Sequence, residues 1–118
     1  MAYEKHLLTV SLEAESDLTD KQYHFVKVSN PFKCDLATDA TEAVGVVVNN
    51  PRLGMSGAVV FNGIVKVKVA DGATVTAGKG VAVTNGEASG DGTLGVVLET
   101  VTGAGYATIL LGVTLAST

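Results

Sequence analysis

The sequence is poor in the residues on which most binding and catalytic chemistry depends. Its 118 residues include three tyrosines, three phenylalanines and no tryptophan, with one arginine, one cysteine and two histidines. Nucleic-acid binding is disfavoured, because base stacking needs aromatic side chains and phosphate neutralisation needs cations, whereas the net charge here is −4. The single Cys34 excludes an intramolecular disulfide and any multi-cysteine metal site, and we expect it to be a small buried residue.

Long apolar runs are also missing. No segment approaches the roughly 20 consecutive apolar residues that a membrane-spanning helix needs. The N-terminal residues, MAYEKHLLTVSLEAE, carry acidic and polar side chains where a secretory signal needs a basic start followed by an apolar block. We therefore expect no membrane partner, and a protein that is cytoplasmic and reduced when it is synthesised.

β-branched residues are what the sequence does have. Nineteen valines and thirteen threonines make up 32 of the 118 residues, and such side chains favour the half-buried surface of a pleated strand. Val65, Val67 and Val69 alternate with Lys66 and Lys68. This period-2 pattern predicts a strand with one buried and one exposed face.

Glycine-containing dipeptides mark the expected chain reversals. Asn62-Gly63 is the strongest of these signals and predicts a hairpin between strands at 58–61 and 64–70. Asp71-Gly72 and Asn85-Gly86 predict two further tight turns, because both offer the positive φ that such turns require.

The remaining segments complete an all-β pattern. We expect further strands at 4–12, 22–28, 32–36, 44–48, 94–101 and 105–115, weak helical character at 37–43, and a flexible surface loop at 86–92. The strand at 22–28 has apolar residues on both faces, which indicates burial on both sides or a bulge. About eight or nine short strands predict a small antiparallel β-sandwich or β-barrel with little helix. We expect a single domain over 1–118, with an N-terminal arm or strand over about 1–12.

No combination of residues predicts a catalytic or metal centre. His6 and His24 lie in strand patterns, and no spacing pairs either with a nucleophile and an orienting partner, so we expect partly exposed strand histidines. Together with Cys34 they lack the spacing of metal ligands. We therefore expect no enzyme activity, no cofactor and no bound metal.

One alternative comes from the turn-and-strand run at 71–83, which resembles biotinyl and lipoyl carrier domains. Those domains present a modified lysine at the tip of a hairpin. Here Lys66 and Lys68 lie within a strand and Lys79 lies between glycines, so the modification motif is missing.

Four segments, taken in order, resemble the small capsid cement (head decoration) proteins of tailed bacteriophages. They are DLTDKQYHFVKVS (17–29), EAVGVVVNNPRLGMSGAVVFNG (42–63), VKVADGATVTAGKGVAV (67–83) and SGDGTLGVVLETVTGAGYATILL (89–111). The resemblance rests on the order and spacing of these segments rather than on any one of them. It implies an all-β structural virion protein that binds the major capsid protein on the capsid exterior, after assembly in the host cytoplasm. Alternatives are a head-fibre base or a tail-associated domain.

The resemblance also implies a homo-oligomer on the capsid, with a trimer favoured over a monomer. Tyrosine and arginine are common interface anchors, and Arg52 is the only arginine. The expected capsid contacts are therefore the N-terminal segment, Ala2, Tyr3, Glu4 and Lys5, and the loop residues Pro51, Arg52 and Leu53. A solvated Arg52 and a Tyr3 that caps the core remain open as the alternative.

Overall fold

The computed structural model of the protein describes residues 5–103 and 105–114. Within these residues the chain forms strands and turns, with no helix and hence none that could cross a membrane. The strands are β1 (Lys5–Ala14), β2 (His24–Asn30), β3 (Lys33–Leu36), β4 (Gly45–Val47), β5 (Ser56–Lys68), β6 (Thr74–Val75), β7 (Gly80–Thr84), β8 (Glu87–Gly92), β9 (Leu94–Val97), β10 (Val101–Thr102) and β11 (Tyr106–Thr114). The all-β prediction is confirmed.

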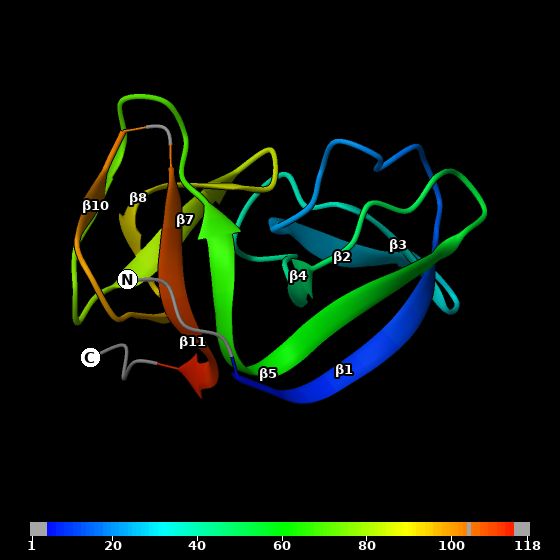
Figure 1. Ribbon diagram of the computed structural model, residues 1–118, viewed down its shortest axis with the longest axis horizontal. Helices are drawn as coiled ribbons and strands as arrows, with labels where there is room; N and C mark the ends of the chain where they lie inside the picture. The colour runs from blue at the N-terminus through cyan, green and yellow to red at the C-terminus, as the bar shows by residue number, and fades with distance from the viewer. Residues whose placement is uncertain (1–4, 104, 115–118) are drawn as a thin grey trace.

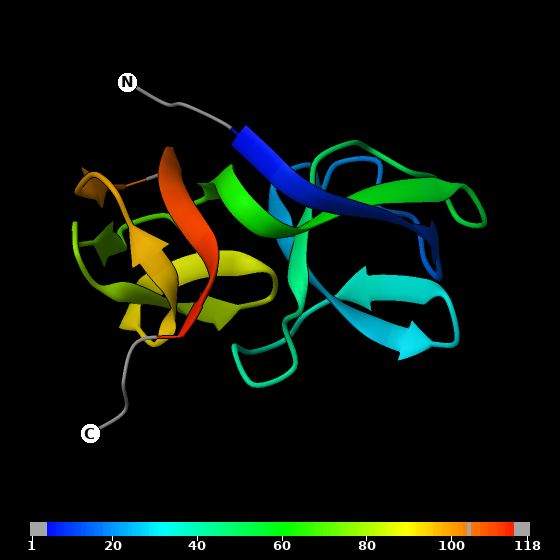
Figure 2. The same cartoon turned by 90° about the horizontal axis from the view of Figure 1, so that it is seen from below.

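Nine of these strands form one sheet in the order β1-β3-β2-β4-β5-β11-β9-β7-β8. A further pairing of β1 with β5 closes the first five into a small barrel, on the right in Figures 1 and 2. The barrel is not wholly antiparallel, because β1 and β3 run parallel at Glu13–Lys33 and Ala14–Cys34. The strands β11, β9, β7 and β8, with the separate β6–β10 pair, form what we call the outer half.

Two cores lie on opposite faces of the central strands. One, inside the barrel, contains Leu12, Ala14, Leu18, Val26, Cys34, Val47 and Val59. The larger core contains Phe25, Val46 and Val60 from the barrel and the buried residues of the outer half, including Val65, Val67, Val69 and Ile109. Consecutive residues of β2, β4 and β5 point into different cores, as alternation along a strand requires. The two-sided apolar pattern at 22–28 therefore reflects burial on both faces.

The predicted hairpin at Asn62-Gly63 is wrong. Both residues lie inside β5, which runs without reversal from the barrel into the outer half (Figure 1). A type I′ turn needs positive φ at both central residues, and only Gly63 has it, at 115°. The flanking segments find other partners: β1 pairs with the first part of β5, and β11 pairs with the last. Gly63 thus allows β5 to bend where it passes from one core to the other.

The segment at 86–92, predicted to be a loop, is mostly the strand β8. Its glycine-rich composition is typical of loops, but main-chain pairing does not require side chains, and β8 pairs with β7 from Thr84–Glu87 to Gly80–Gly92. Asn85 and Gly86 have φ of 50° and 79°, so the predicted turn there is confirmed. Together with the two-residue strands β6 and β10, this raises the number of strands to eleven.

The segment at 37–43 forms a turn rather than helix. Side chains bond to the backbone in place of a helical ladder, because Asp39 accepts from the Thr41 amide at 3.0 Å and Glu42 accepts from the Thr38 amide at 2.6 Å. This turn leads into β4, where Val46 and Val47 are fully buried.

Candidate functional site

The described residues contain no catalytic constellation around their one described histidine side chain. His24 is buried rather than partly exposed, with Nδ1 3.2 Å from the Gln22 carbonyl oxygen and Nε2 3.8 Å from the Glu87 carboxylate. Among the described side chains no hydroxyl or thiol bonds to it. The contact joins β2 to β8 and so links the barrel to the outer half. His6 lies in β1, but its side chain is outside the described part.

The described residues contain no metal-ligand cluster either. Among them, no three histidine, cysteine, aspartate or glutamate side chains are grouped so that they could hold a metal ion. Cys34 is fully buried, 3.9 Å from the Leu12 carbonyl oxygen, as predicted. Burial, together with the charge of Asp35, raises the pKa of its thiol. A thiol held protonated in an apolar core is a poor nucleophile.

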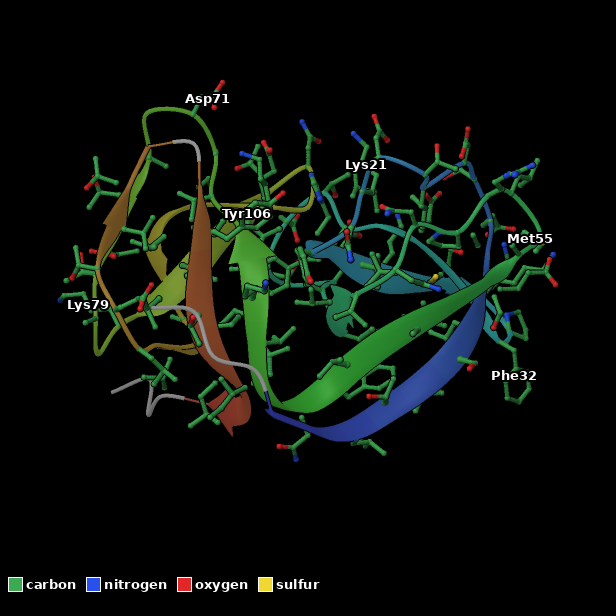
Figure 3. All side chains as sticks on the ribbon, in the orientation of Figure 1. Lys21, Phe32, Met55, Asp71, Lys79 and Tyr106 are labelled. Atoms are coloured by element: carbon green, nitrogen blue, oxygen red, sulfur yellow. The ribbon has the colours of Figure 1, made fainter. Side chains whose placement is uncertain are left out.

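Exposed apolar side chains do gather, at the end of the barrel farthest from the outer half. Two loops meet the end of β1 there: the Glu13 amide donates to the Phe32 carbonyl at 3.0 Å, and the Ala14 amide donates to the Met55 carbonyl at 2.8 Å. Because consecutive amides of a strand point to opposite edges, the two loops flank β1, roughly 10 Å apart. Phe32 and Met55 project from this end in Figure 3. We call the exposed side chains Phe32, Arg52, Leu53 and Met55 the distal tip.

Phe32 is the most exposed large apolar side chain of the described chain, at 83%. It follows Pro31 in the reversal that joins Asn30 of β2 to Lys33 of β3, and its φ is 59°. A proline followed by a residue of positive φ is the pattern of a type II turn, in which glycine is favoured at the second position. A side chain there costs about 1–2 kcal/mol. The turn therefore holds an aromatic ring in solvent at a cost to its backbone.

The second loop, residues 48–55, is fixed by hydrogen bonds at both ends and in the middle. Asn49 closes its base, donating to the Ser56 carbonyl at 3.2 Å and accepting from the Ala58 amide at 2.9 Å. The Pro51 carbonyl accepts from the Leu18 amide at 2.9 Å. The loop consequently presents Leu53 and Met55, which are 65% and 59% exposed, from a fixed backbone.

Beside Met55 the surface is hollowed. An open depression of about 340 Å³ is lined by Asn49, Asn50, Pro51, Arg52, Met55 and Ser56. Arg52 is exposed, and among the described residues no carboxylate lies within 4.0 Å of its guanidinium group. The neighbouring Lys33, by contrast, is paired with Glu13 at 3.6 Å. The distal tip therefore combines exposed apolar side chains, a small hollow and one unpaired cation.

The structure separates the residues that the sequence nominated as capsid contacts. Ala2, Tyr3 and Glu4 lie outside the described residues, and Lys5 begins β1 opposite Ile64. Lys5 and the distal tip are thus at opposite ends of β1, up to about 30 Å apart along the strand. Arg52 and Leu53 are exposed at the tip, whereas Pro51 is buried and positions the loop rather than forming a surface.

Phe32 and Met55 are absent from the contacts predicted from the sequence, which placed Phe32 at the start of a strand at 32–36, whereas β3 begins at Lys33. Pro31 is the sequence signal for the turn, because a residue directly after proline in a short reversal has no strand face on which to be buried. Met55 follows the Gly54 turn and precedes β5, so its exposure could not be read from periodicity.

A pair of tyrosine rings elsewhere in the molecule has a structural role. The Tyr23 and Tyr106 rings meet edge to face at a centroid distance of 5.5 Å. Lys66 and Lys68 lie over them, with Nζ 5.0 Å and 5.8 Å from the respective ring centroids. Tyr23 packs against the larger core, so this cluster joins the barrel to the outer half.

Comparison with known proteins identifies a fold. No protein-family model matches the chain, and no curated protein matches it in sequence. Among solved structures, the N base of the head fibre protein gp8.5 of bacteriophage phi29 is similar, with a TM-score of 0.65. The similarity covers 92% of this chain and 98% of that one, at 14% sequence identity. Nearly the whole of both chains therefore shares one fold.

Proposed function

We propose that this protein is a structural component of a tailed-bacteriophage virion and binds the outer surface of the capsid. The observation that carries the proposal is the fold shared with a head-fibre base over nearly the full length of both chains. Independently, the order of four sequence segments resembles that of capsid cement proteins. The proposed partner is the major capsid protein, and the proposed location is the capsid exterior, after assembly in the host cytoplasm.

The rest of the molecule fits a protein that acts through its surface. His24 lies within hydrogen-bond distance of the Gln22 carbonyl oxygen and 3.8 Å from Glu87 of β8, and Cys34 is a buried, protonated thiol. We therefore propose that the protein is not an enzyme and needs no cofactor. Capsid lattices repeat each contact many times, so a modest interface is sufficient when several copies are linked. A trimer is the assembly we favour, with a monomer as the alternative.

Two roles on the capsid remain distinct candidates. As a cement protein the chain would reinforce the lattice, as the sequence resemblance implies. As the base of a head fibre it would attach a projecting structure, and the similarity to the phi29 head fibre N base favours this role specifically. The carrier-domain alternative is less favoured, because Lys66 and Lys68 lie over tyrosine rings instead of at a hairpin tip.

Deletion of the gene from the phage that encodes it separates these roles. A cement function predicts virions that release DNA at lower temperature or after milder osmotic shock than the parent. A fibre-base function predicts capsids of unchanged stability that have lost surface projections in electron micrographs. Mass spectrometry of intact purified protein tests the carrier role, which requires a mass adduct on a lysine. Absence of the protein from parental virions would contradict both capsid roles.

A further inference from the structure

Three residues other than glycine have positive φ in the described chain, and two of them are explained by the fold. Asn85 begins the β7–β8 turn. Tyr23 donates its amide to the Val47 carbonyl at 2.7 Å and accepts from the Lys68 amide at 2.9 Å, while its ring packs on the larger core. Phe32 is the third, and its ring is 83% exposed. The fold gains no core packing from this ring.

The backbone that carries Phe32 is held firmly despite its strain. Its carbonyl accepts from the Glu13 amide, and Lys33, the next residue, pairs with both Glu13 of β1 and Asn30 of β2. Proline at position 31 restricts the turn further. A ring fixed in this way loses little backbone entropy on binding, which is the property of an effective interface anchor. Strain retained at an exposed site is a signal of function when the surrounding structure enforces it.

Arg52 supplies the charge at the same end of the molecule. It borders the 340 Å³ hollow together with Asn50 and Met55. A guanidinium group binds a carboxylate through two parallel hydrogen bonds, so an unpaired arginine beside a hollow favours an acidic side chain in a partner. Aromatic and arginine side chains are also the commonest energetic anchors of protein interfaces.

From these observations we propose that the distal tip is the attachment surface, on which Phe32 enters an apolar socket of a partner protein and Arg52 pairs with a carboxylate beside that socket. This inference rests on the proposed function, which makes the partner a capsid protein. The molecule would then stand end-on, with its longest dimension of 35 Å directed away from the capsid and the Lys79 end outermost (Figure 3).

The test uses the full chain and capsids purified from a phage strain that lacks it. Phe32→Gly removes the ring and relieves the turn, so the variant should melt at or above the wild-type temperature. It should nevertheless bind capsids roughly 30-fold or more weakly in a dilution series. Leu98→Ala is the matched control, since Leu98 is an exposed apolar residue of the outer half, 46% exposed, and this variant should bind as wild type.

Charge reversal tests the second part of the inference. Arg52→Glu should weaken capsid binding at least 10-fold. The affinity of Arg52→Lys should lie between those of wild type and Arg52→Glu, because lysine keeps the charge but loses the paired hydrogen bonds. Lys79→Glu makes the same charge change at the opposite end and should bind normally. Sedimentation of wild type and Phe32→Gly checks whether the tip instead joins copies of this chain.

The outcomes separate the inference from the function beneath it. If wild type binds capsids and both Phe32→Gly and Arg52→Glu bind as tightly, the inference is overturned but the proposed function is not. A marked fall in the melting temperature of Phe32→Gly would also overturn the inference, because the ring would then stabilise the fold. Loss of self-association in Phe32→Gly would overturn it too, because the ring would then join copies of this chain. Failure of the wild-type protein to bind capsids would overturn the proposed function and this inference with it.

Discussion

The backbone amide of Phe25 in β2 donates a 2.7 Å hydrogen bond to the carbonyl of Gly86, at the tip of the β7–β8 hairpin. This hydrogen bond holds the β7–β8 hairpin of the outer half against the barrel. Gly86 has a φ of 79°, and a Cβ added there would overlap Leu36 Cδ1 and lie 3.1 Å from the Phe25 carbonyl oxygen. The junction between the two halves therefore needs a residue without a side chain.

Gly86→Ala should consequently reduce the free energy of unfolding by about 2–4 kcal/mol, combining backbone strain with overpacking. Gly72→Ala is the control, because Gly72 has a similar φ of 76° but no atom within 4 Å of its Cβ position. It should cost about 1–2 kcal/mol from strain alone. Urea denaturation of both variants measures the difference. Equal losses of unfolding free energy in the two variants would mean that the hairpin tip is not packed closely against the barrel.

Cys34 should be unreactive in the folded protein. Its side chain is fully buried, and burial raises the pKa of its thiol above the ordinary value of 9.0. A thiol reagent at pH 8 should therefore label the protein only after unfolding. Rapid labelling of the native protein would show that the barrel opens.

The same thiol affects stability at high pH. Because the pKa of this thiol is raised in the folded protein, its contribution to the free energy of unfolding is fully present below the unfolded pKa and is lost as the pH rises through the folded pKa. Cys34→Ser should therefore make the free energy of unfolding fall less at alkaline pH. The substitution should also lower that free energy by about 1–3 kcal/mol, because a hydroxyl group enters an apolar core. Capsid binding should be unchanged. A folded Cys34→Ser variant that fails to bind would reveal a role for the thiol.

Glu42 makes the turn before β4 sensitive to acid. Hydrogen bonds from the Thr38 hydroxyl and the Thr38 amide lower the pKa of its carboxyl below the ordinary value of 4.5, with Lys27 adding to the effect. A lowered folded pKa gives stability that is present above pH 4.5 and is lost as the pH falls through the folded value. The melting temperature of Glu42→Gln should therefore fall less than that of wild type between pH 4.5 and pH 2.5. An equal fall in the melting temperatures of wild type and Glu42→Gln would contradict this role of the Glu42 carboxylate.

Deletion of residues 2–5 tests the N-terminal half of the predicted capsid contact. If this segment contributes to attachment, the deletion weakens capsid binding while the circular dichroism spectrum stays that of a β-protein. Attachment through the distal tip alone predicts wild-type occupancy, since Lys5 and the tip lie at opposite ends of β1. Comparison of this deletion with Arg52→Glu decides between the two surfaces.

Much of the fold follows from local sequence patterns, and two of the exceptions share one cause. The alternation at Val65, Val67 and Val69 predicts a buried strand face correctly, since all three are fully buried. The Asn62-Gly63 dipeptide does not form a hairpin, because a hairpin needs the two flanking segments to pair with each other. Here the segment before it pairs with β1 and the segment after it pairs with β11. Non-local pairing also makes a strand of the glycine-rich segment at 86–92.

The candidate site was predictable only in part, for a related reason. Arg52 and Leu53 could be placed on an exposed loop from the turn formers around them. That Phe32 and Met55 lie at the same end could not be foreseen, because it depends on β1 ending between their two loops. Local patterns show which residues are exposed, whereas the barrel closure decides which of them are neighbours.

Electron cryomicroscopy of the virion shows directly which end of the molecule meets the capsid. We predict density of this fold on the capsid exterior, with the Pro31-Phe32 turn and the 48–55 loop against the major capsid protein and the β6–β10 pair outermost. Three copies around a threefold or quasi-threefold point would match the trimer we favour, and isolated copies at hexamer centres would contradict it. Virions without such density would contradict the proposed function, and density with the distal tip pointing into solvent would contradict attachment through this surface.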